Sequence, residues 1–266
     1  MIRRIACLCA LAAGAGCDWM PGKPVAPEVD RGNPTSVHGF EPLWATNCQG
    51  CHGADGTWGP ARPLNDPLYQ SLVTDQWLRT TISDGIAGTL MPPHAVQNGG
   101  WMTDDQIDEI VSGMRAAWAA TPPPYAADSP PIIHWSGQAG DAARGRTTFN
   151  TYCSECHGED GVGATAGSPI DSSYLALASD QAIRAAIVCG RPDLGMPDWH
   201  GNLNGAPAPQ FKGLTPLTEG QVADLLAWIT SHRVEFPGQP YPPTGNNEPG
   251  FRPSPKTPET EGLTHG

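Results

Sequence analysis

The chain has 266 residues, which is enough for about two domains of ordinary size. It contains 32 glycines and 29 prolines, so we expect irregular segments and linkers beside the folded parts. Acidic side chains outnumber basic ones by 27 to 15, giving a formal net charge of −12. This excludes nucleic acid as a partner, because phosphate binding needs a basic surface.

The first predicted element is an export signal. Arg3 and Arg4 precede a short apolar stretch that ends in small residues, a pattern typical of a secretory signal peptide over residues 1–16. The apolar stretch is too short to cross a bilayer comfortably, although an uncleaved anchor is the alternative interpretation.

Cys17 follows this signal directly. Residues 14–17 resemble the cleavage site of bacterial lipoproteins, although Gly14 stands where that pattern prefers leucine. We therefore expect lipidation of Cys17 and attachment to the periplasmic side of a bacterial membrane. Cleavage after Ala15, which would give a soluble periplasmic protein, remains the alternative. Residues 17–35 are expected to be extended.

The first folded unit is predicted over residues 36–120, with an all-α fold. Apolar spacing and capping signals predict three helices. The last begins at a Thr103–Gln106 capping box, in which the threonine closes the helix start and the glutamine reaches back. The expected ranges are 40–47, 74–83 and 103–118.

A proline-rich linker over residues 121–138 is expected to be stiff and extended. A second unit follows over residues 139–235, with helices expected over 142–152, 179–188 and from 218 onward. It carries a ten-residue insertion around residues 201–213. The proline-rich tail over residues 236–266 is expected to be disordered or to lie on a partner.

The two units are copies of one another. Cys48-x-x-Cys51-His52 and Cys153-x-x-Cys156-His157 begin 105 residues apart, and this offset holds without a gap as far as Met91-Pro92 and Met196-Pro197. Chance does not keep such a register over more than forty positions. The sequence therefore predicts a duplicated domain.

Each copy carries the attachment motif of c-type haem. In Cys-x-x-Cys-His, the two thiols form thioethers with the haem vinyl groups and the histidine ligates the iron. A thioredoxin-like redox pair and half of a zinc site are the alternatives. The first needs no histidine, and the second needs two further ligands in each copy. We therefore expect two covalently bound haems, on Cys48, Cys51 and His52 and on Cys153, Cys156 and His157.

Met91 and Met196 are predicted to be the second axial ligands. Each lies 43 residues after the first motif cysteine and precedes a proline that would stiffen its loop. Methionine is by default core filler, but the matching register favours ligation. Met102 and Met114 have no counterparts and are given no ligand role. His94 and His200 do not align, and we place both at the surface or beside a ligand.

The motifs, the middle helix, the Met-Pro loop and the final amphipathic helix resemble the class I cytochrome c family over residues 39–118 and 140–233. This resemblance implies a compact helical fold with a partly exposed haem edge. It also implies an iron held between His52 and Met91, and another between His157 and Met196. Filled axial positions leave no site for a substrate, so each iron changes by one electron.

An electron carrier without enzymatic activity is thus the expected function, with redox proteins as partners. It is either free-standing or a subunit of a respiratory or photosynthetic complex. Cys189 leaves an alternative open. It is either a small apolar residue near the haem wall or an iron ligand, as in the dihaem thiosulfate dehydrogenases that the chain distantly resembles. A dihaem peroxidase or thiosulfate dehydrogenase-like enzyme is therefore the second hypothesis, and a purely structural subunit is the third.

Overall fold

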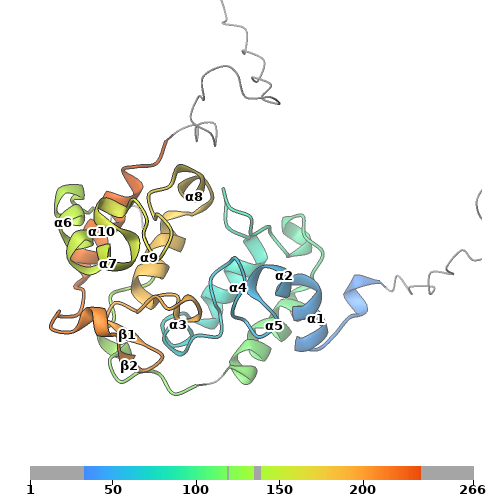
Figure 1. Ribbon diagram of the computed structural model, residues 1–266. Coiled ribbons are helices and arrows are strands. Elements are labelled where there is room, and N and C mark those ends of the chain that lie inside the picture. The colour runs from blue at the N-terminus through green and yellow to red at the C-terminus, as the bar shows by residue number, and fades with distance from the viewer. Residues whose placement is uncertain (1–32, 119, 135–138, 235–266) are drawn as a thin grey trace, which may run out of the picture.

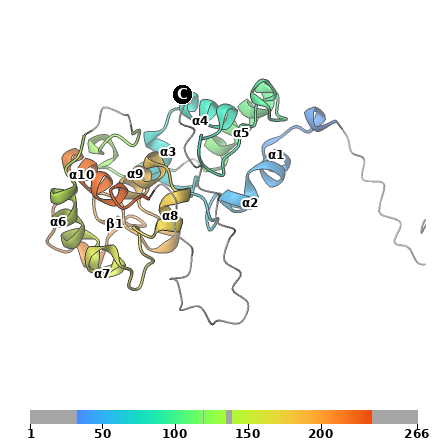
Figure 2. The ribbon, with the colours of Figure 1, turned by 90° about the horizontal axis from the view of Figure 1, so that it is seen from above.

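The computed structural model describes residues 33–118, 120–134 and 139–234. Within them, two helical units with the same order of elements lie side by side (Figures 1 and 2). The first unit comprises α1 (Phe40–Asn47), α2 (Gln49–His52), α3 (Pro67–Leu72), α4 (Asp75–Asp84) and α5 (Asp104–Ala117). The second comprises α6 (Ala142–Tyr152), α7 (Ser154–His157), α8 (Ser172–Leu177), α9 (Asp180–Cys189) and α10 (Glu219–Thr230).

The predicted all-α fold is confirmed. The strands of the described residues are one pair within the insertion, where β1 (Asn202–Leu203) runs antiparallel to β2 (Ala206–Pro207). The predicted signal peptide, Cys17 and the tail over 236–266 lie outside the described residues. No helix among the described residues has both the length and the apolar character needed to cross a bilayer.

The helix boundaries follow from capping side chains. Both predicted capping boxes form, and Thr103 and Thr218 accept hydrogen bonds from the backbone N–H three residues on. The middle helices begin one residue later than predicted, because Thr74 and Ser179 are caps outside the helix.

Two helices in matching places, α3 and α8, were missed by the sequence reasoning. Asp66 caps α3 by accepting hydrogen bonds from the N–H groups of Leu68 and Tyr69. Asp171, which aligns with Asp66 at the 105-residue offset, caps α8 in the same way. An aspartate at the same position in both copies was therefore the available signal.

The first and last helices of each unit cross at close range. In the second unit the small residue at the crossing lies on the first helix, and in the first unit it lies on the last helix. In the second unit, a Cβ added to Gly145 would lie 2.0 Å from the carbonyl oxygen of Asp224, so α6 and α10 touch through their backbones beside Trp228. At the aligned positions the first unit exchanges large for small: Phe40 replaces Gly145, and Gly113 replaces Trp228. The packed volume at the crossing is thereby kept.

The described part of the linker is bound to the second unit. Tyr125 donates a hydrogen bond from its hydroxyl to Asp198 at 2.6 Å. Further along, the carbonyl of Pro131 accepts from the fully buried Arg184, and Ile132 is 4% exposed. The proline-rich segment therefore does not span freely between the units over these residues.

Candidate haem-binding sites

Each attachment motif forms one turn of helix directly after the first helix of its unit. In the first copy, the N–H groups of Cys51 and His52 both donate to the carbonyl of Cys48, at 3.1 and 3.0 Å. The second copy repeats this turn from Cys153 to His157. The turn holds the two thiols and the imidazole within one short segment, which suits a group bound at three points. None of the four motif cysteines forms a disulfide with another described residue.

Both motif histidines are oriented by a backbone carbonyl. Nδ1 of His52 bonds to the carbonyl of Arg62 at 2.9 Å, and Nδ1 of His157 bonds to the carbonyl of Gly167 at 2.7 Å. A carbonyl only accepts, so each Nδ1 carries the proton and each Nε2 keeps a free lone pair. This is how a metal-ligating imidazole is usually fixed by the group behind it. The donor set therefore fits haem iron.

The thiols of the first motif cysteines are not activated. Burial raises the pKa of Cys48 to about 12, and the neighbouring Cys51 adds to this shift. Burial likewise raises the pKa of Cys153 to about 12. Redox-active cysteine pairs and thiolate metal ligands need the opposite shift, toward the thiolate. The Cys48 and Cys153 thiols therefore lack the stabilised thiolate expected of the thioredoxin-like and zinc alternatives.

The two predicted methionine ligands occupy matching loops after the middle helices. Each loop is tied back to its helix end: Ile86 N–H donates to the Met91 carbonyl, and Arg191 N–H donates to the Met196 carbonyl, both at 3.0 Å. Gly190 permits this approach, since it has φ of +68° and an added Cβ would lie 2.4 Å from that Met196 oxygen. Met91 and Met196 are both half-buried.

The remaining methionines and histidines considered in the sequence analysis pack against other side chains. Met102 and Met114 are each 1% exposed and belong to the core of the first unit. His200 stacks on Tyr125 with ring centroids 4.1 Å apart. His94 is not at the surface, because it is only 6% exposed and packs against Trp101. Of the two places expected for His94, the surface is therefore wrong, and a place beside a ligand stays a prediction.

Cys189, expected either near the haem wall or as an iron ligand, is the last residue of α9. It is 3% exposed and lies beside Arg62 of the first unit, with which its thiol interacts. Burial raises the pKa of the Cys189 thiol to about 12. It is therefore a protonated residue at the contact between the units.

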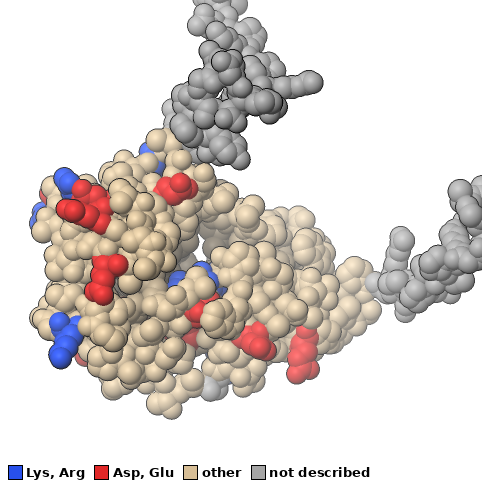
Figure 3. Space-filling view, in the orientation of Figure 1, with Lys and Arg blue, Asp and Glu red and all other residues tan. Residues whose placement is uncertain are grey.

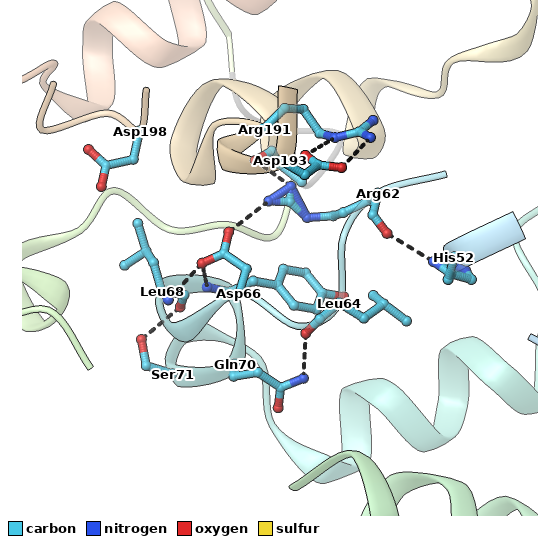
Figure 4. Close-up of polar contacts among 12 residues, drawn as sticks. His52, Arg62, Leu64, Asp66, Leu68, Gln70, Ser71, Arg191, Asp193 and Asp198 are labelled. Carbon is cyan, nitrogen blue, oxygen red and sulfur yellow. Dashed lines mark hydrogen bonds and ion pairs between the residues drawn. The ribbon is translucent and has the colours of Figure 1, made fainter. Parts of the chain in front are cut away.

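Sequence reasoning missed Arg62 altogether. Its guanidinium lies 4.7 Å from the centre of the Tyr69 ring and 3.9 Å from Asp66 Oδ2 (Figure 4). The backbone carbonyl of Arg62 also accepts the hydrogen bond from Nδ1 of His52. The sequence offered no signal for it: Arg62 aligns with Gly167, and only the structure shows that both carbonyls anchor a motif histidine.

A helical unit of this kind, present twice with an anchored histidine in each attachment turn, defines a tandem c-type cytochrome. The family model "Cytochrome C oxidase, cbb3-type, subunit III" matches residues 36–112 and 140–229, and the chain belongs to this family. The expected relation to cytochrome c is therefore confirmed. Cytochrome c domains bind haem c covalently, and the two domains imply two haems.

Relatives of known name support this placement. The chain is 28% identical over 181 residues to the "Cbb3-type cytochrome c oxidase subunit CcoP" of Azospirillum sp. (strain B510), which covers 60% of this chain and 54% of the relative. It is 27% identical over 188 residues to the corresponding subunit FixP of Rhizobium etli, covering 63% and 56%. The chain thus spans about half the length of these relatives.

Among solved structures, the "Kuenenia stuttgartiensis reducing HAO-like protein complex Kustc0457/Kustc0458" is 16% identical, with a TM-score of 0.39. The match covers 76% of this chain and 98% of that one, and the likeness is too slight to support an argument.

Proposed function

We propose that the protein is a dihaem electron carrier, with one haem on Cys48, Cys51, His52 and Met91 and the other on Cys153, Cys156, His157 and Met196. The single observation that carries this proposal is the repeated anchoring of the motif histidine, which leaves Nε2 free in both units. The matching methionine loops support a thioether as the opposite ligand.

Haem iron between an imidazole and a thioether exchanges one electron at a comparatively high potential. The chain's own residues hold that arrangement. The carbonyls of Arg62 and Gly167 fix the two imidazoles, and the hydrogen bonds of the Met loops limit movement of the thioethers. Filled axial positions favour a carrier over a peroxidase or thiosulfate dehydrogenase-like enzyme. The buried place of Cys189 between the units gives no support to its role as an iron ligand.

The partners we propose are other redox proteins of a membrane respiratory complex, because the relatives are named as oxidase subunits. The net charge of −12 would favour a partner with a basic docking surface. A lipid on Cys17 would hold the carrier at the periplasmic face of the membrane.

Spectroscopy on the purified protein tests the carrier role. We expect two haems per chain, both low-spin, with the near-infrared band of methionine ligation in the oxidised state. A high-spin haem, or turnover with hydrogen peroxide or thiosulfate, would instead establish an enzyme.

A further inference from the structure

The two units meet through the loops that carry axial-ligand candidates. The loop after His52 supplies Trp58 and Gly59, and the loop before Met196 supplies Arg191 and Asp193. Arg191 donates to the Gly59 carbonyl at 3.1 Å, and the Trp58 N–H donates to Asp193 at 3.2 Å. Charged side chains gather in the recess between the units (Figure 3).

Arg191 and Asp193 form an ion pair with two hydrogen bonds within their own loop. The guanidinium binds the carboxylate through two hydrogen bonds, at 3.0 and 2.9 Å, and the Asp193 side chain is only 2% exposed. Burial raises the pKa of Asp193, but the hydrogen bonds and positive charge of Arg191, together with backbone N–H donors including that of Trp58, lower it by more, so the net shift is downward. Both members of this ion pair also bond to the first unit, Arg191 to the Gly59 carbonyl and Asp193 to the Trp58 N–H.

Arg62 makes a second contact between the units, in which a side chain of the first unit bonds to the backbone of the second. Its guanidinium donates to the Ala185 carbonyl of α9 at 3.1 Å, while its own carbonyl holds the ring of His52 (Figure 4). One residue thus links the histidine of the first unit to the helix that leads into the Met196 loop.

The internal repeat shows that the crossing side chains are not part of the shared haem fold. Arg62 aligns with Gly167, and Trp58 aligns with Gly163. In the other direction, Arg191 and Asp193 align with Ile86 and Gly88. The side chains of Arg62, Arg191 and Asp193 that make these bonds therefore each occur in only one copy, whereas Trp58 and Gly59 take part through their backbones.

We propose that this contact, formed by Trp58, Gly59 and Arg62 with Ala185, Arg191 and Asp193, is the internal junction across which electrons pass between the haems. Arg62 and Arg191 are its positioning residues. The inference rests on the proposed function, since both units must carry haem. Linked domains move relative to each other by default, and electron transfer weakens steeply with separation. Holding the two ligand loops in contact keeps that separation fixed.

The test uses the full-length dihaem protein and the double variant Arg62→Gly with Arg191→Gln. Glycine is the residue with which the second unit anchors its own histidine, so His52 keeps its carbonyl. Losing hydrogen bonds from a charged group lowers a docking equilibrium constant by about tenfold for each residue. We expect a larger radius of gyration in X-ray scattering and slower electron exchange between the haems after pulse reduction.

Arg144→Gln is the matched control, because Arg144 forms the same two-bonded pair with Asp224 inside the second unit. It should leave compactness and exchange rate as in the wild type. Exchange at the wild-type rate in the double variant, with both haems low-spin, would overturn the junction. Failure of the carrier role is distinguishable, since it would appear in the wild type as a missing or high-spin haem.

Discussion

Phe40 of α1 lies directly against Gly113 of α5, so closely that a Cβ on Gly113 would come within 2.3 Å of the phenyl ring. We expect Gly113→Ala to destabilise the first unit by about 1–2 kcal/mol, because overpacking at the crossing outweighs the better helix propensity of alanine. Denaturant unfolding followed by circular dichroism measures this change.

Gly220 of α10 provides the contrast, since an added Cβ would meet only Thr218 Oγ1, at 4.0 Å. Gly220→Ala should be neutral or should stabilise by about 0.5 kcal/mol. If both substitutions change the free energy of unfolding alike, then close packing at Phe40 is not what requires glycine at position 113.

Replacing a methionine on the Met-Pro loop should change one haem only. In Met91→Leu, we expect loss of the sulfur ligand, a high-spin signal from one haem and a lower reduction potential for it, while the other haem stays low-spin. Electron paramagnetic resonance and a potentiometric titration measure these effects. Met102→Leu is the control, because Met102 is core filler and leucine conserves its volume. A low-spin spectrum unchanged in Met91→Leu would remove Met91 from the ligand set.

Gly190 is expected to be essential to the second methionine loop. In Gly190→Ala, a backbone conformation with φ of +68° and ψ of −167°, which essentially only glycine adopts, costs about 1–3 kcal/mol, and the Cβ also meets the Met196 carbonyl. The loop should move and produce a high-spin haem. Gly205 has φ of +81° with nothing near its Cβ position, so Gly205→Ala should show the backbone cost alone and keep both haems low-spin. Equal spectra for the two variants would contradict this account.

The stability of the second unit should depend on pH through Asp160. Hydrogen bonds from Arg146, and then from Asn150, lower the pKa of this carboxyl from 3.8 to about 2. Because the folded pKa is the lower one, its stabilising contribution is present above about pH 4 and is lost as the pH falls toward 2.

Arg146→Gln should therefore weaken the protein against denaturant at pH 6, and the difference from the wild type should shrink near pH 2. A difference of equal size at both values would show that the ion pair with Asp160 is not the cause.

The sequence by itself determined the duplication, the attachment turns and most helices. These features depend on short-range signals, such as the Cys-x-x-Cys-His spacing, a threonine cap at Thr103 and apolar residues on one helix face. A signal of this kind acts within one or two turns and can be recognised without knowing the partner element. The helices at α3 and α8 were missed because their caps stand in short, weakly periodic segments.

Only the tertiary structure decided how the two units meet. Arg62 and Ala185 are 123 residues apart in sequence, and neither carries a local mark of the other. The contact depends on the packing of whole loops and on burial of Cys189 and Asp193, which no neighbouring residue dictates. His94 is buried because the chain folds back and packs Trp101 against it, a contact that no residue type at position 94 indicates.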